Sequence, residues 1–259
     1  MLLVIDVGNT NTSLGVYEAN TLIKHWRLTT ARARTVDEYG VHARNLFELA
    51  GIDFNAITAV AIASVVPSLN YTLKRMSEVY FRQTPLFVDH TAQTGLEIMY
   101  EPPSDVGADR IADAVAARAK YGAPCIIVDF GTATNFEVID AMGRYLGGVL
   151  VPGITISADA LFGRAARLPR VEIKRPVRAI GKSTVEAMQA GLYYGYVGLV
   201  DGILRRMLDE LGAPPPPPPV RIIATGGLAP LIATGSELIE TVDDTLTLDG
   251  LRLIYEQTK

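Results

Sequence analysis

The feature that most constrains the fold is a short pattern that occurs twice. Residues 3–16 read LVIDVGNTNTSLGV and residues 126–139 read IIVDFGTATNFEVI. Each copy is typical of an apolar strand, a turn that contains glycine and a second strand of alternating polarity. In the alignment of the two copies, Asp129, Gly131, Thr132 and Thr134 fall on Asp6, Gly8, Asn9 and Asn11. The repeat therefore predicts two similar lobes.

The composition of the two turns indicates what they bind. Each turn follows a carboxylate, Asp6 or Asp129, and consists of glycine with small amides and hydroxyls. Backbone N–H groups without bulky side chains around them suit the wrapping of an anion. A carboxylate beside an anion repels it unless a cation lies between them. Two such turns facing each other across a cleft are therefore predicted to hold a phosphate chain with a metal ion.

Strand and helix patterns alternate through the rest of the chain. Strands are predicted at residues 58–66, 86–88, 134–139, 144–151 and 220–225. Helices are predicted at about residues 36–50, 68–80, 153–162, 183–211 and 246–257. This alternation favours an α/β fold of mixed sheets flanked by helices, with an N-terminal lobe at 1–115 and a C-terminal lobe at 116–259. The six prolines at 214–219 predict a stiff polyproline spacer.

Composition and charge exclude several classes of partner. The net charge is −4 with a pI of about 5.5, and the charge pattern favours neither nucleic acid nor an anionic membrane. Without a signal-peptide pattern or a run of about 18 apolar residues, the chain is expected to be cytoplasmic. The single cysteine, Cys125, lies in the apolar run CIIVDF and is predicted to be a buried strand residue.

Three further patterns are weaker than they first look. The stretch GKST at 181–184 resembles a P-loop, but that motif requires glycine at position 176, which is Pro176. Ser183 and Glu186 instead predict a helix capping box.

The predicted helix 183–211 carries four spaced glycines, which favour tight packing or a subunit contact: Gly191, Gly195, Gly198 and Gly202. The three histidines lack the spacing of a zinc site.

The segment from Tyr100 to Lys120 carries further candidate chemistry. Two prolines precede Gly107, Ala108, Asp109 and Arg110, which open a predicted helix. The N-terminal amides of a helix favour an anionic group. Beside a phosphate site, the carboxylate and the guanidinium can act as base and anion clamp. The alternative is that these charges only complement the helix dipole.

Taken in order, these motifs resemble the type III pantothenate kinase family. They are DVGNTNTS, GADR preceded by a tyrosine and prolines, DFGTATNFEVID, GGVLVPG at 147–153 and TGG at 225–227. The resemblance spans essentially the whole chain. It implies the two-lobed fold of actin, sugar kinases and heat-shock ATPases, and ATP-dependent phosphorylation of pantothenate, the first step of coenzyme A synthesis. It also implies Mg²⁺, a monovalent cation (K⁺ or NH4⁺) and a cytoplasmic homodimer.

The resemblance also implies roles for individual residues. The ATP phosphates would contact Asp6, Val7, Gly8, Asn9, Thr10, Asn11, Thr12, Ser13 and Thr132, with Asp6 near Mg²⁺. Gly226 and Gly227 would lie in the loop that runs past the nucleotide base, and Asp129 would bind the monovalent cation. Asp109 would be the catalytic base. The pantothenate pocket would comprise Tyr100, Gly107, Ala108, Asp109, Arg110 and Thr184. Asn135 departs from the expected small hydroxyl residue.

Two other functions remain open from the residues. A kinase for another small hydroxylated acid or sugar would differ only in the shape of its pocket. A non-catalytic regulatory member of the same superfamily would be expected to lack one of Asp6, Asp109 and Asp129, and all three are present. Phosphoryl transfer needs positioning and charge neutralisation more than covalent chemistry, so backbone cradles, a metal and one oriented carboxylate are sufficient.

Overall fold

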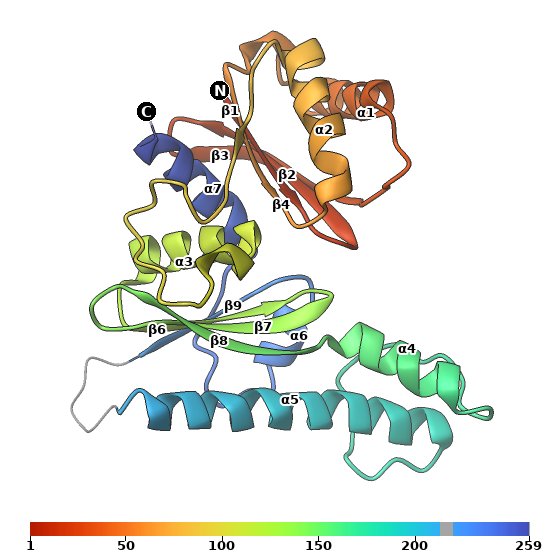
Figure 1. Cartoon of the computed structure of the whole chain (residues 1–259). Coiled ribbons are helices and arrows are strands. Elements are labelled where there is room, and N and C mark those ends of the chain that lie inside the picture. The colour runs from red at the N-terminus through yellow and green to blue at the C-terminus, as the bar shows by residue number, and fades with distance from the viewer. Residues whose placement is uncertain (213–219, 259) are drawn as a thin grey trace. The chain divides into compact units, whose positions relative to one another are not determined.

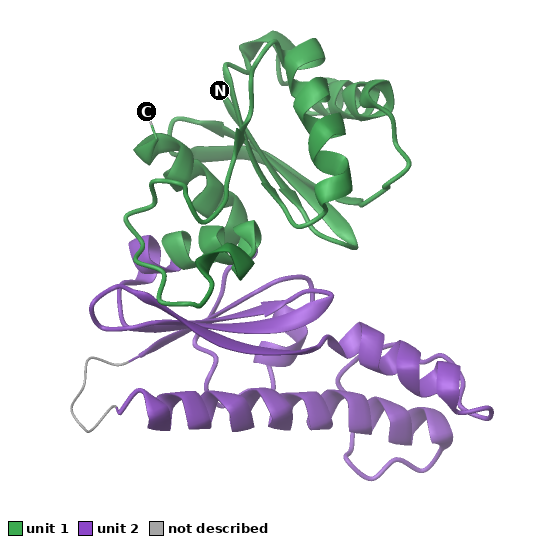
Figure 2. Cartoon of the chain, in the orientation of Figure 1, with its two compact units in different colours: residues 1–116, 245–259 green, residues 117–244 purple. Residues whose placement is uncertain are grey.

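The structure is a computed structural model that describes residues 1–212 and 220–258. The chain divides into two compact units, coloured separately in Figure 2. Unit 1 comprises residues 1–116 and 245–259, and unit 2 comprises residues 117–244. Each unit is built around a five-stranded mixed sheet with helices, as the repeat predicted. The predicted polyproline spacer at 214–219 lies outside the described residues.

The sheet of unit 1 has the strand order β3-β2-β1-β4-β5 (Figure 1). Its strands are β1 (Leu2–Val7), β2 (Asn11–Glu18), β3 (Thr21–Thr29), β4 (Ala59–Ser64) and β5 (Leu86–Phe87). β1, β2 and β3 pair antiparallel, whereas β4 and β5 continue the sheet in parallel with β1. The helices of this unit are α1 (Val36–Leu49), α2 (Pro67–Met76), most of α3 (Ala108–Tyr121) and α7 (Leu246–Gln257), with short turns at Phe54–Ala56, Ser77–Phe81 and Pro103–Asp105.

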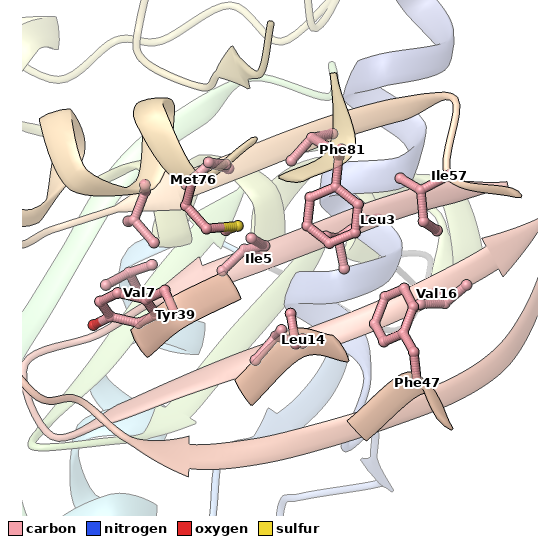
Figure 3. Close-up of a cluster of buried hydrophobic side chains, with 14 of the residues drawn as sticks. Leu3, Ile5, Val7, Leu14, Val16, Tyr39, Phe47, Ile57, Met76 and Phe81 are labelled. Carbon is pink, nitrogen blue, oxygen red and sulfur yellow. The ribbon is translucent and has the colours of Figure 1, made fainter. Parts of the chain in front are cut away.

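Strand β1 lies at the centre of unit 1, which explains its unbroken apolar sequence. Leu3 and Ile5 belong to a buried cluster with Phe47 of α1 and Met76 of α2 (Figure 3). On the other face, α7 contacts β1, β2 and β4. The sheet is therefore covered by helices on both faces.

Unit 2 repeats this topology in the order β10-β9-β6-β7-β8. Its strands are β6 (Cys125–Phe130), β7 (Ala133–Ile139), β8 (Tyr145–Pro152), β9 (Arg221–Thr225) and β10 (Thr241–Val242). Its helices are α4 (Ile154–Arg164), α5 (Thr184–Glu210) and α6 (Ala229–Ala233). α5 and α6 pack side chains such as Tyr193, Val200 and Ile232 against β6 and β7. The duplication thus extends from the hairpins to both sheets.

The register of the two hairpins differs by one residue, which corrects the sequence alignment. Val7 pairs with Thr12 across the first turn, and Phe130 pairs with Thr134 across the second. The second turn is one residue shorter, so the counterpart of Thr134 is Thr12 rather than Asn11. Beyond the turn, Asn135 pairs with Asp129 as Ser13 pairs with Asp6. The amide of Asn135 therefore occupies the place of a small hydroxyl.

The C-terminal helix departs from the lobe limits drawn on the sequence. α7 lies where a helix was predicted, but it packs in unit 1 rather than with residues 117–244. Tyr17 donates a hydrogen bond to Asp249 Oδ1 at 2.7 Å, and Thr247 donates one to Asp113 at 2.6 Å. A Cβ on Gly250 would lie 2.0 Å from a backbone oxygen of α3. Such contacts join residues far apart in the sequence, and a boundary drawn along the chain does not show them.

Helix α5 follows its prediction, with two differences. Ser183 caps it by accepting from the Glu186 N–H at 3.2 Å, but the Glu186 carboxylate accepts from the backbone N–H of Lys182 rather than of Ser183. A Cβ on Gly191, Gly195 or Gly198 would meet no described atom within 4 Å. No part of the described chain therefore packs tightly against these three glycines. Their predicted role in a subunit contact remains a prediction. None of the described helices combines the length and apolar character needed to cross a membrane.

Candidate active site

The first candidate half-site is the turn between β1 and β2 in unit 1. The Gly8 N–H donates to the Asn11 carbonyl at 2.9 Å and closes the turn. Asp6 precedes the turn, at the carboxyl end of β1 where β4 also ends. Ligands of open α/β sheets bind beyond the carboxyl ends of the strands. The position of this turn therefore agrees with the predicted phosphate site.

Thr30, which follows β3, fixes this turn. Its hydroxyl donates to the Gly8 carbonyl at 2.7 Å and lies 2.9 Å from the Thr12 hydroxyl. Its backbone N–H donates to the Thr10 carbonyl at 2.9 Å. Two residues further on, Arg32 Nη2 donates to Asn9 Oδ1 at 2.9 Å. Sequence reasoning missed both residues, because neither carries a motif and both reach the turn only through the pairing of β2 with β3.

The segment predicted to bind the phosphate acceptor lies at the same edge of the unit 1 sheet. Val65, directly after β4, donates its N–H to the Val7 carbonyl at 3.1 Å. A Cβ on Gly107 would lie 3.3 Å from the Val65 side chain. Gly107 directly precedes α3, which begins at Ala108. The GADR segment is thus positioned beside the end of β1, and the structure brings it near the first turn.

Glycine at position 107 makes room for the candidate base. A Cβ there would lie 2.4 Å from Asp109 Oδ1, so another residue type would displace the carboxylate. Asp109 Oδ1 accepts from the Arg110 N–H at 2.8 Å. The Arg110 guanidinium lies 5.7 Å from the centre of the Tyr100 ring, a cation–π distance. Tyr100, Gly107, Asp109 and Arg110 are therefore brought together as predicted.

Burial raises the pKa of Asp109 above the 3.8 of an ordinary aspartate. The Arg110 N–H and the Arg110 charge act in the opposite direction, but the effect of burial on the pKa is larger. A carboxylate with a raised pKa is a stronger proton acceptor, which suits a general base. The raised pKa is compatible with the role of Asp109 as base, which stays a prediction beside the alternative of a complement to the helix dipole.

The second candidate half-site is the turn between β6 and β7 in unit 2. A Cβ on Gly226, which follows β9, would lie 2.5 Å from Asp129 Oδ1, and Gly226 has a φ of +91° that favours glycine. The Gly153 N–H donates to the Thr132 carbonyl at 3.1 Å. A Cβ on Gly153 would lie 2.3 Å from that oxygen. Glycines thus surround the Asp129 carboxylate and the Thr132 turn.

A tyrosine of α5 braces this second turn as Thr30 braces the first. The Tyr196 hydroxyl lies 2.6 Å from Thr134 Oγ1 and donates to the Pro152 carbonyl at 3.0 Å. Burial raises the pKa of Tyr196, which keeps the phenol protonated. Each unit therefore holds a buried threonine beside its turn, Thr12 or Thr134, with a hydroxyl partner from another element. This correspondence follows from the corrected register.

Thr184 lies apart from the other predicted residues of unit 2. It is the first, exposed residue of α5, twelve residues before Tyr196. At 1.5 Å per residue, about 18 Å of helix separates the two. Its predicted role in the pantothenate pocket is therefore not supported by contacts within its own unit, and it remains a prediction.

The residues at the two turns suit a cation that is bound partly by phosphate and water oxygens, rather than a metal ion bound by protein side chains alone. Residues 1–212 and 220–258 contain no cluster of three or more His, Cys, Asp or Glu side chains that could hold a metal ion. Mg²⁺ in kinase sites is commonly bound by one or two carboxylates, substrate phosphates and water. Asp6 and the glycine-lined Asp129 offer such carboxylates. Cys125 is buried, and burial raises the pKa of its thiol to about 12, so it offers no reactive thiolate.

Comparisons with known structures agree with the fold. An activator of 2-hydroxyisocaproyl-CoA dehydratase from Clostridium difficile, with bound ADPNP, matches with a TM-score of 0.51 at 12% identity, over 99% of this chain and 95% of that one. A protein from Sinorhizobium meliloti assigned as a 2-dehydro-3-deoxygalactonokinase matches with a TM-score of 0.59 at 11% identity, over 99% of this chain and 95% of that one. At such identities the likeness shows the fold alone, that of sugar kinases and actin-like ATPases.

Comparisons of sequence identify the family. A type III pantothenate kinase of Koribacter versatilis is 56% identical over 100% of this chain and 96% of the relative. Another, from Anaeromyxobacter sp. (strain Fw109-5), is 56% identical over the full length of both. The family model described as type III pantothenate kinase matches residues 2–206, which include both turns and the GADR segment. The chain therefore belongs to the type III pantothenate kinase family.

Proposed function

We propose that this chain transfers the γ-phosphoryl group of ATP to the primary hydroxyl of pantothenate, the first step of coenzyme A biosynthesis. Membership of the family supports this activity. The single structural observation that carries it is the Asp109 carboxylate, which Gly107 accommodates at the sheet edge where the first turn lies. A kinase for an unactivated alcohol needs such a carboxylate beside its phosphate site.

In this proposal Asp109 is the general base. As the pantothenate oxygen bonds to the γ-phosphorus, its proton passes to the Asp109 carboxylate, and the bond from phosphorus to the ADP oxygen breaks. Gly107, Ala108, Arg110 and Tyr100 bind the acceptor beside it. Pantothenate carries a carboxylate at its other end, which a guanidinium and helix N-terminal amides can bind.

The two turns bind the phosphates of ATP. In unit 1 the contacts come from Asp6, Val7, Gly8, Asn9, Thr10, Asn11, Thr12 and Ser13. In unit 2, Thr132 contacts the phosphates, and Gly226 and Gly227 pass the nucleotide base. Glycine is required at 226 because a Cβ would collide with Asp129 and Phe130. The backbone geometry of both turns supports these assignments.

Two cations complete the site in this proposal. Asp6 is assigned to the vicinity of Mg²⁺, and Asp129 to a monovalent cation, K⁺ or NH4⁺. When bound, these cations neutralise the phosphate charge that both carboxylates would otherwise repel. Gly226 supports the assignment, because a Cβ there would lie 2.5 Å from Asp129 Oδ1 and would displace the carboxylate assigned to the ion.

The remaining parts of the proposal are assembly and location. The exposed face of α5, with Gly191, Gly195 and Gly198 open, is assigned to a homodimer contact. Thr184 is the first residue of this helix, so its proposed role in the pantothenate pocket is tied to the formation of the homodimer. A cytoplasmic location fits a chain whose single cysteine is a buried free thiol.

A coupled assay of ADP release tests the activity. Purified protein with ATP, Mg²⁺ and K⁺ is offered pantothenate and, separately, a panel of small hydroxylated acids and sugars. Release that depends on pantothenate alone supports the proposal. Faster ADP release with another acceptor would instead identify the protein as a kinase for that compound. ATP binding without release for any acceptor would favour the non-catalytic alternative.

A further inference from the structure

The first phosphate turn has no cation of its own. Residues 2–23 contain no Lys, Arg or His, and their two charged side chains are the carboxylates of Asp6 and Glu18. A triphosphate bound there meets backbone N–H groups and repulsion from Asp6. One divalent cation neutralises only part of the charge of ATP, and kinases and ATPases commonly add a Lys or Arg at the phosphates. In this unit the cation has to come from another segment.

Arg32 brings a guanidinium to this turn. Its Nη2 donates to Asn9 Oδ1 at 2.9 Å, and Asn9 lies in the centre of the turn. Two residues earlier, Thr30 holds the chain against the turn, because it donates hydrogen bonds to the carbonyls of Gly8 and Thr10. The approach of Arg32 to the turn is thus set by backbone pairing as well as by its own side chain.

The guanidinium keeps most of its binding capacity. Arginine carries five N–H donors, and the bond to Asn9 uses one terminal nitrogen. The side chain is exposed. Among the residues that the structure describes, no carboxylate forms an ion pair with it. A fork of donors beside a phosphate turn matches the geometry of phosphate oxygens, which arginine binds in bidentate fashion.

We propose that Arg32 binds the terminal phosphates of ATP and neutralises their charge during transfer, with Asn9 orienting its guanidinium. This assignment rests on the proposed kinase function. Arg32 forms no covalent bond: the phosphoryl group passes from the ADP oxygen to the acceptor oxygen while the guanidinium donates hydrogen bonds to phosphate oxygens. Such fixed donors are effective because they need no rearrangement as charge develops.

The test compares Arg32→Gln and Arg32→Lys with Arg34→Gln. Arg34 is a matched control, since it lies two residues away and its guanidinium sits 5.8 Å from the centre of the Tyr39 ring. Arg32→Gln is expected to lower kcat/KM for ATP by about 10²- to 10³-fold, the range for loss of one preorganised donor. Arg32→Lys should retain part of the activity, because it keeps the charge and loses the fork. Melting temperatures and the KM for pantothenate should stay close to wild type.

Calorimetric titration with ADPNP, a non-hydrolysable ATP analogue, and with AMP separates failure of this proposal from failure of the kinase function. A weaker affinity for ADPNP with unchanged affinity for AMP in Arg32→Gln supports the contact with the terminal phosphates, even if the wild type does not phosphorylate pantothenate. ADPNP affinity and kcat/KM equal to those of Arg34→Gln would overturn the role of Arg32 and leave the proposed function intact.

Discussion

Asp109→Asn is the substitution that tests the catalytic assignment most directly. Asparagine keeps the shape of the side chain, the space that Gly107 leaves and an oxygen that accepts the Arg110 N–H. It removes the negative charge and the capacity to accept a proton from an alcohol. Loss of a general base commonly lowers kcat by about two to four decades. At 1.36 kcal/mol per decade, this is about 3 to 5 kcal/mol of transition-state free energy.

The pKa of Asp109 predicts an accompanying change in stability. Because burial raises this pKa in the folded state, the folded protein binds the proton more tightly than the unfolded chain does. The resulting stabilisation is complete below the ordinary pKa of 3.8 and is lost as the pH rises through the folded-state pKa. Asparagine does not ionise, so the melting temperature of Asp109→Asn relative to wild type should increase with pH across this window. In wild type, kcat/KM should fall as the pH drops through the same raised pKa.

Steady-state kinetics and melting curves on the same preparations provide the measurement. Asp113→Asn is the control, because Asp113 lies one turn along α3, is buried and accepts a hydrogen bond from Thr247 of α7. This control should lose stability and keep kcat near wild type. The reasoning is refuted if Asp109→Asn folds, melts normally and retains nearly full kcat.

Three further predictions concern unit 2. Replacing K⁺ by Na⁺ or a bulky organic cation should abolish turnover, since Asp129 needs a counter-charge beside the phosphates; unchanged rates in K⁺-free buffer would remove its proposed role. Gly195→Leu should shift light scattering toward the monomer with little effect on its melting, because a Cβ there meets no described atom of its own chain within 4 Å; a fully active wild-type monomer would contradict the dimer proposal. Tyr196→Phe leaves Thr134 without its hydroxyl partner and should cost about 1–3 kcal/mol and raise the KM for ATP. Tyr193→Phe, which alters a longer hydroxyl contact of 3.2 Å on the same helix, is its control, and equal effects of the two would argue against a specific brace.

The sequence predicted the fold well because its main signals are local and repeated. The strand and turn patterns around Asp6 and Asp129 identify both hairpins, and equal hairpins imply equal sheets. The helix over 183–211 was predictable from its capping serine and its periodicity. The shorter second turn, which shifts the register at Thr134, was not predictable from the sequence. An ungapped alignment of the two copies matches apolar and polar residues on both sides of the turn, so it gives no sign of the missing residue.

The candidate site was predictable where its residues are contiguous and not where pairing brings them together. The GADR segment forms one short stretch, so its carboxylate and guanidinium are visible in the sequence. Thr30, Arg32 and Tyr196 reach the turns from a neighbouring strand end or from a helix more than 60 residues away. Nothing in the sequence around these residues marks the hydrogen bonds that they form.

The return of α7 to unit 1 has a consequence for how the chain is made. The ribosome completes β1 to β5 early, yet the helix that covers one face of that sheet emerges only after residues 117–244. At about 5 to 20 residues per second, roughly 8 to 32 seconds pass between the synthesis of β5, which ends at Phe87, and that of α7, which begins at Leu246. During that interval the face that will receive Leu248 lacks its covering helix, and by its end unit 2 has all its residues and can fold. Unit 1 is thus the first unit to begin synthesis and the last to be completed. Its uncovered sheet face is the part of the nascent chain that a chaperone would be expected to bind.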